Sequence, residues 1–182
     1  MMKERGMFML GVQIESIAIA RPEQVRGNDY YLEHFARRGK DISRLLEKVG
    51  RKTRYIATDE ENSLTLGIEA ALEALRRANI TGKEIDLLIF SSQTPEFLVP
   101  MNSLAIHRAI DGSKGMINFD LNANCIGMFL SIEQAVYTLQ NNPRVERALV
   151  IGSDELSFLS NENSTLTYSI FGDAAVALVL KK

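Results

Sequence analysis

The 182-residue sequence contains one cysteine, no tryptophan and two histidines. A single cysteine excludes an intrachain disulfide framework and a cysteine-based zinc site, and it favours a reducing compartment. His34 and His107 have no partner histidine at helical spacing, so we expect neither to bind a metal. The sequence also lacks the glycine-rich dinucleotide fingerprint and the P-loop, which leaves no predicted metal site and no expected bound cofactor.

An excess of one charge and long apolar runs are missing as well. Lys and Arg number 21 against 23 Asp and Glu, and the formal net charge is −2, so bulk charge gives no reason to expect nucleic-acid binding. Gln13 and Glu15 interrupt the apolar patch near the N-terminus, and no run of about 18 apolar residues occurs. We therefore expect a cytoplasmic protein that binds neither nucleic acid nor membrane.

The pattern of apolar residues predicts one cooperative α/β unit over residues 1–182. Residues 85–90 are almost continuously apolar, which is typical of a strand covered on both faces of a parallel sheet. Thr58 and Glu61 fit a capping box before a helix that ends near Asn79. Further strands are expected at 12–19, 53–57, 116–121, 147–152 and 168–180, and further helices at 30–37, 42–49, 102–110 and from residue 125 to about 141.

The most informative stretch, residues 119–135, runs from an apolar strand through small polar residues into a helix, with Cys125 at the turn. A thiolate is favoured by the free N–H groups at a helix N-terminus, and it is the form of cysteine that attacks thioesters in acyl transfer. The competing interpretation is a small buried hydrophobe. We expect Cys125 in the first turn of a well-packed helix, because apolar residues recur at helical spacing at Ile126, Phe129, Ile132, Val136 and Leu139.

One segment is strongly basic, with eight cations between positions 37 and 54. Such a run is either a solvated helical face or a docking surface for an acidic carrier protein or a phosphate-bearing ligand. Its members are Arg37, Arg38, Lys40, Arg44, Lys48, Arg51, Lys52 and Arg54.

Five segments carry a resemblance to a known family. They are Asp-Leu-Asn-Ala-Asn-Cys-Ile-Gly at 120–127, Ile-Gly-Ser-Asp at 151–154, Ile-Phe-Gly-Asp at 170–173, and the stretches 50–56 and 84–95. In this order and spacing they resemble the N-terminal half of the β-ketoacyl-acyl-carrier-protein synthase III family, in the thiolase superfamily. The resemblance implies a thiolase-like, five-layered α-β-α-β-α fold of two similar halves, of which this chain is the first, and the C-terminal catalytic half is absent.

The resemblance also implies a reaction. Cys125 matches the nucleophile that takes an acyl group from a coenzyme A or phosphopantetheine-carrier thioester and condenses it with malonyl-carrier protein in fatty acid or related biosynthesis. In the family the catalytic His and Asn come from the second half, so we expect this chain alone to be inactive in condensation. The implied partners are acyl carrier protein or acyl-CoA, and a second subunit in a homodimer formed along the strand before the nucleophile.

Further site residues follow from the same resemblance. Val99, Leu156 and Phe171 are expected to bind substrate, with the loop of Val99 reaching the acyl pocket of the partner subunit. Carrier or coenzyme A docking is assigned to Arg44, Lys48 and Arg51.

The chain departs from the family pattern at several positions. Arg44 and Lys48 stand where many relatives carry a Trp and an Arg, and Ala174 and Val176 stand where glycines are common. Asn124 and Ile126 flank the cysteine where smaller residues are usual. Two alternatives stay open: another acyl-transferring thiolase-superfamily enzyme, such as a hydroxymethylglutaryl-CoA synthase-like protein or a tailoring acyltransferase, and a non-catalytic partner subunit. A half-fold also predicts an exposed apolar face and association in isolation.

Overall fold

A computed structural model describes residues 11–182, and its main element is a five-stranded sheet in the order β1-β7-β6-β4-β5. Strand β4 pairs in parallel with β5 and β6, whereas β7 pairs antiparallel with β6 and β1. The sheet is therefore mixed rather than wholly parallel. The strands are β1 (Gln13–Ala20), β4 (Leu87–Ser91), β5 (Ile117–Leu121), β6 (Arg147–Glu155) and β7 (Asp173–Lys181).

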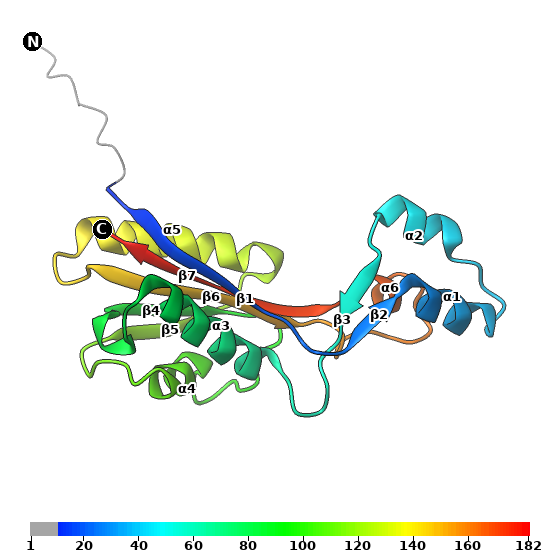
Figure 1. Ribbon diagram of the computed structural model, residues 1–182, viewed down its shortest axis with the longest axis horizontal. Helices are drawn as coiled ribbons and strands as arrows, with labels where there is room; N and C mark the ends of the chain where they lie inside the picture. Colours follow the sequence, from blue (N-terminus) through cyan, green and yellow to red (C-terminus); the bar gives the residue numbers. More distant parts are fainter. Residues whose placement is uncertain (1–10) are drawn as a thin grey trace, which may run out of the picture.

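Helices cover both faces of this sheet (Figure 1). On one face lie α3 (Ser63–Ala78) and α4 (Asn102–Ala109), and on the other lies α5 (Gly127–Asn141). Alternate residues of β4 belong to different cores: Leu88 and Phe90 pack with α3, and Leu87 and Ile89 pack with α5. The prediction of a central strand covered on both faces is confirmed.

A second group of elements projects from one end of the sheet (Figure 1). It consists of the hairpin strands β2 (Val25–Gly27) and β3 (Thr53–Tyr55) and the helices α1 (Asn28–Ala36), α2 (Ser43–Val49) and α6 (Thr167–Ile170). We call it the lobe. A separate small core of Tyr31, Phe35, Ile42 and Leu46 holds it together. Strand β2 was not expected from the sequence, because three residues are too few to show an apolar alternation.

The N-terminus of α3 differs from the prediction. The helix is capped by Asn62, whose side chain accepts hydrogen bonds from the N–H groups of Leu64 and Thr65 at 3.0 and 2.9 Å. Thr58 and Glu61 form a separate turn instead, in which the Glu61 carboxylate accepts from the N–H and hydroxyl of Thr58. The predicted end of the helix is confirmed, since Asn79 adopts a left-handed conformation with φ 56°.

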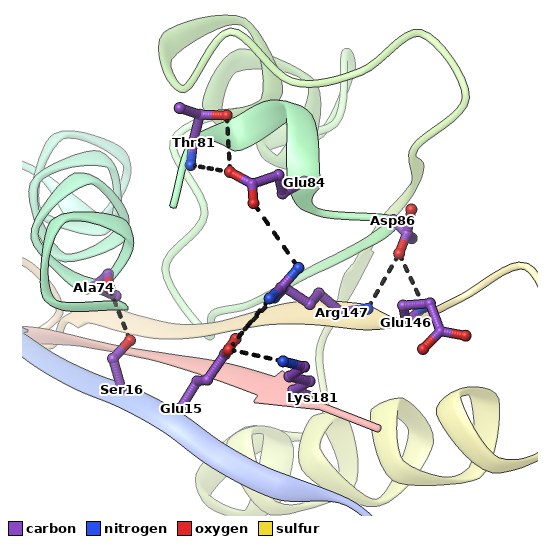
Figure 2. A network of polar contacts seen from close by, with 9 residues as sticks. All are labelled: Glu15, Ser16, Ala74, Thr81, Glu84, Asp86, Glu146, Arg147 and Lys181. Atoms are coloured by element: carbon purple, nitrogen blue, oxygen red, sulfur yellow. Dashed lines mark hydrogen bonds and ion pairs between the residues drawn. The ribbon is translucent and has the colours of Figure 1, made fainter. Parts of the chain in front are cut away.

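A network of charged groups ties the ends of three strands together (Figure 2). The Arg147 guanidinium donates from Nε to Glu15 Oε2 at 2.9 Å, and Lys181 Nζ lies 3.6 Å from the other oxygen of Glu15. The Asp86 carboxylate accepts from the backbone N–H groups of Glu146 and Arg147. The hydrogen bond from Arg147 lowers the pKa of the Glu15 carboxyl below its usual value.

One side of the sheet is only partly covered. Along β1, Ala18 and Ala20 pack against α3, so Ile17 and Ile19 point to the α5 side, where they are 45% and 57% exposed. On the outside of α5, Phe129 is also exposed. We call these three residues the uncovered apolar surface.

Within residues 11–182 no helix has the length and apolar character needed to cross a membrane.

Candidate functional site

Cys125 lies at the edge of the sheet where β4, β5 and β6 end. It follows β5 in the short 3₁₀ turn η2 (Asn124–Ile126), which leads directly into α5, and its side chain is exposed. The turn begins with Asn124, which has a φ of 51° and whose N–H donates to Asn122 Oδ1 at 3.1 Å. The predicted position between strand and helix is therefore correct, but Cys125 precedes the α-helix instead of lying within its first turn.

Gly127 fixes the start of α5 against the sheet. A Cβ atom at this position lies 2.4 Å from the Ser91 hydroxyl oxygen at the end of β4, so only glycine allows so close an approach. No side chain caps α5, and the Gly127 N–H donates to the backbone oxygen of Asn124 in the turn that contains Cys125. Backbone N–H groups at a helix start can donate hydrogen bonds to a negatively charged sulfur or to a developing oxyanion.

The packed face of α5 agrees with the predicted one only in part. Its buried residues are Gly127, Ser131, Ala135 and Leu139, whereas Ile126 and Phe129 are 56% and 73% exposed. Small residues on the buried face let the helix lie close to the sheet. The same closeness is seen at Gly152, where an added Cβ lies 2.7 Å from the sulfur of Met128. Of the five apolar residues predicted to face the core, Leu139 is buried and Ile132 and Val136 are partly buried against the same core. The prediction is therefore confirmed for these three residues and wrong for Ile126 and Phe129.

Two carboxylates at the ends of β5 and β6 hold the loop that follows β4. Asp120 accepts from the N–H groups of Asn102 and Ser103 at 2.7 and 2.8 Å, which fixes the start of α4. Asp154 accepts from the N–H of Gln93 at 2.6 Å. From the sequence these residues had a place in the family pattern but no predicted role, and the available signal was a carboxylate directly at the end of an apolar strand.

A third carboxylate, Asp173 at the start of β7, ties the lobe to the sheet. It is 3% exposed and accepts from the N–H of Ala57 at 2.7 Å and from the N–H and hydroxyl of Ser157 at 2.8 and 2.6 Å. Nearby, burial raises the pKa of the Glu155 carboxyl, and the charges of Asp173 and Glu96 add to the effect. Asp173 therefore sets the position of the chain after β6, which includes Leu156.

The structure does not bring the three predicted substrate-binding residues together in one pocket. Val99 lies on a protruding loop and is 89% exposed, whereas Leu156 and Phe171 are half-buried. Phe171 alone of the three lines a cavity of about 360 Å³ between the lobe and the end of β6. Their role in substrate binding stays a prediction.

The three cations predicted to bind a carrier protein or coenzyme A have different surroundings. Arg44 and Lys48 are exposed on α2 and line one shallow groove, whereas the Arg51 guanidinium donates to the backbone oxygen of Ile170. The two histidines are occupied elsewhere, with Nε2 of His34 bonded to the Glu162 backbone oxygen and Nε2 of His107 to that of Ser113. In the described part of the chain no three acidic, His or Cys side chains form a cluster that could hold a metal ion.

Three tyrosines line the cavity that Phe171 also lines, and we call it the tyrosine cavity. Tyr30 and Tyr31 come from α1 and Tyr168 from α6, and the hydroxyls of Tyr30 and Tyr168 lie 2.9 Å apart. Burial, together with this hydrogen bond, raises the pKa of Tyr168 to about 12. The other residues that line the tyrosine cavity are Arg26, Ile56, Ala57, Glu155, Ser157, Phe158, Ser160 and Glu162.

Comparison with known proteins gives related sequences. Residues 119–182 match the family model described as 3-Oxoacyl-[acyl-carrier-protein (ACP)] synthase III. Over 173 residues the chain is 33% identical to a β-ketoacyl-[acyl-carrier-protein] synthase III of Erythrobacter litoralis, covering 95% of the chain and 52% of the relative. A protein of the same name from Mycobacteroides abscessus is 34% identical over 165 residues, with 91% and 47% coverage. The chain thus spans about half the length of the curated relatives it matches.

Solved structures share the fold. The 3-oxoacyl-[acyl-carrier-protein] synthase III of Aquifex aeolicus superposes with a TM-score of 0.85 at 28% identity, over 94% of this chain and 54% of that one. A 3-oxoacyl-(acyl-carrier protein) synthase of Burkholderia xenovorans gives 0.88 at 23% identity, over 94% and 48%. The α/β fold of this chain is therefore thiolase-like, as the sequence indicated.

Proposed function

Because the chain is related to the β-ketoacyl-[acyl-carrier-protein] synthase III family, we propose that Cys125 accepts an acyl group from a thioester. The observation that supports this most directly is the position of the thiol. Cys125 is exposed, it follows β5 at the edge of the sheet, and it stands beside the uncapped start of α5.

In the proposed step, the Cys125 thiolate attacks the carbonyl carbon of the donor thioester. The tetrahedral intermediate carries its negative charge on oxygen, and the proposed donors are backbone N–H groups at the start of α5, which no side chain caps. The bond from that carbon to the donor sulfur then breaks, the donor leaves as a thiolate that takes up a proton, and an acyl-cysteine thioester remains.

The donor is proposed to be acyl-CoA or acyl carrier protein, which end in the same phosphopantetheine thiol. Arg44 and Lys48, exposed together on α2, are the proposed contact for its phosphate or acidic surface. Condensation with malonyl-carrier protein needs further acid, base and oxyanion groups. The two histidines lie in α1 and α4 with backbone partners, so we propose that the chain alone is acylated without condensing, and that the whole protein acts as a homodimer in the cytoplasm.

The acylation is tested by incubating the folded chain with acetyl-CoA and mapping the mass of its peptides. We expect an acetyl adduct on Cys125 that hydroxylamine removes. Cys125→Ser is a complete control, because the sequence has no second cysteine. A chain that is folded by circular dichroism and remains unmodified under these conditions would contradict the proposal.

Adding malonyl-carrier protein to the acetylated chain separates the alternatives. Release of carbon dioxide with a β-keto product at an ordinary rate would show that the chain contains a complete condensing site, against our expectation. Transfer of the acetyl group without loss of carbon dioxide would favour a tailoring acyltransferase.

A further inference from the structure

Arg54 in β3 is a buried cation without a counter-ion. It is 3% exposed, and its Nη1 donates to the side-chain oxygen of Asn28. Its Nε and Nη2 are closed to solvent and have no hydrogen-bond partner among residues 11–182. No carboxylate of these residues forms an ion pair with it, and its charged neighbour Arg51 is another cation. A buried charge in this state is costly unless an anion compensates it.

A second unpartnered group lies beside it. Tyr31 is completely buried, its hydroxyl has no hydrogen-bond partner within the described residues, and its ring centroid lies 4.9 Å from Cζ of Arg54. Tyr31 also forms part of the wall of the tyrosine cavity. Tyr31 therefore separates the cavity from Arg54, and the two side chains together hold three donor groups without a partner among the described residues.

The remaining charges of the cavity leave room for an anion. Arg26 lies with its Cζ 4.8 Å from the Tyr30 ring centroid, and it adds a positive charge. Of the two acids in the wall, Glu162 lies 3.5 Å from Arg38, and burial raises the pKa of the Glu155 carboxyl. Arg54 lies behind the wall, and the nearby Asp173 carboxylate already accepts hydrogen bonds from Ala57 and Ser157.

The geometry of Arg54 points to a carboxylate. Its two unpartnered nitrogens, Nε and Nη2, share one edge of the guanidinium, and that edge matches the two oxygens of a carboxylate. We propose that the tyrosine cavity binds a small organic carboxylate, whose oxygens accept hydrogen bonds from Arg54 and the Tyr31 hydroxyl as the Tyr31 ring turns aside. The apolar part of this ligand lies against Tyr30, Tyr168 and Phe171. The site does not depend on Cys125.

Binding can be measured on the whole chain with cyclohexanecarboxylate as the probe and cyclohexanecarboxamide as its uncharged isostere. Three of the five tyrosines line the cavity and the sequence has no tryptophan, so tyrosine fluorescence reports on this site. We expect the carboxylate to change the fluorescence saturably and to raise the melting temperature, and the amide to do neither. Equal responses to both probes, or none to the carboxylate, would overturn the proposal. Since neither probe is a thioester, binding can persist where acylation of Cys125 fails.

Variants locate the contact. Tyr31→Phe removes only the hydroxyl, and Arg54→Met removes the charge at similar length; each should weaken carboxylate binding, by about tenfold or more for Arg54. Arg108→Met, which changes an exposed cation on α4, is the matched control and should bind unchanged. Without ligand, Arg54→Met should melt at a higher temperature than the parent, because an uncompensated buried charge is removed. Unchanged binding in Tyr31→Phe and Arg54→Met would exclude this contact.

Discussion

At the scale of single residues, the edge of the sheet that carries Cys125 is held in place by carboxylates that accept hydrogen bonds from backbone N–H groups. Asp120, Asp154 and Asp173 each bind a different loop, and each does so with bonds of 2.6 to 2.8 Å. Bonds of this kind to a charged acceptor are stronger than neutral ones, and they leave a loop few alternative positions. The edge that carries Cys125 is thus rigid because of acids that take no part in the proposed reaction.

Glu15 gives a prediction about pH. The hydrogen bond from Arg147 lowers the pKa of Glu15 in the folded state, so its contribution to stability is present above the unfolded pKa of about 4.3 and is lost as the pH falls through the lower folded value. Glu15→Gln should lower the free energy of unfolding by about 1–3 kcal/mol at pH 7. The difference from the parent should shrink below pH 4 in urea titrations.

The matched control is Glu23→Gln, which changes an exposed acid without a described partner. It should leave the free energy of unfolding nearly unchanged at either pH. A deficit of Glu15→Gln that stays the same size at low pH would show that Arg147 does not stabilise the charged form of Glu15.

Residues such as Asp173 and Arg54 show why parts of the site could not be predicted from the sequence. Cys125 was recognisable because its strand, turn and helix are local in the chain. The partner of Asp173, Ala57, lies 116 residues away, and the environment of Arg54 is set by Tyr31 and Asn28. A carboxylate or a guanidinium in the sequence looks the same whether its partners are water, backbone or nothing.

At the scale of elements, helix ends with a strong local signal were predictable. Helix α3 ends at Asn79, and α5 ends at Asn141 and Asn142, just before Pro143, as expected. The N-terminus of α3 was missed because two overlapping polar segments both offer a cap, and only the packing of Leu64 and Leu66 in the core selects Asn62. The packed face of α5 was predicted correctly at Ile132, Val136 and Leu139 and missed near the start of the helix, where the small residues Gly127 and Ser131 are buried and Phe129 is exposed.

The cap of α3 can be tested directly. Asn62→Ala removes the acceptor for the N–H groups of Leu64 and Thr65 and should lower the free energy of unfolding by about 1 kcal/mol. Glu61→Ala affects only the exposed turn with Thr58 and should cost well under half as much. Urea unfolding followed by circular dichroism measures both. A larger loss for Glu61→Ala than for Asn62→Ala would mean that α3 is capped by the turn of Thr58 and Glu61, as the sequence predicted, and not by Asn62.

At the scale of the whole molecule, the sequence indicated the α/β class but not the strand order. The final strand β7 inserts between β1 and β6, and its pairing with β1 joins residues from nearly opposite ends of the chain. The same arrangement leaves β1 at an edge, beyond the cover of α5. That is why alternate isoleucines of β1 differ so much in environment from the alanines between them.

The uncovered apolar surface of Ile17, Ile19 and Phe129 predicts self-association of the chain. Large apolar side chains on one side of a sheet favour contact with another surface. Sedimentation velocity should show species heavier than the 20.3 kDa monomer at tens of micromolar protein.

Ile19→Lys combined with Phe129→Lys should shift this distribution towards the monomer. Leu104→Lys places the same charge on a residue of α4 that is 43% exposed on the opposite side of the sheet, and it should leave the distribution unchanged. If the parent chain is monomeric throughout this range, or if the α4 variant dissociates the assembly equally well, the association does not use this surface.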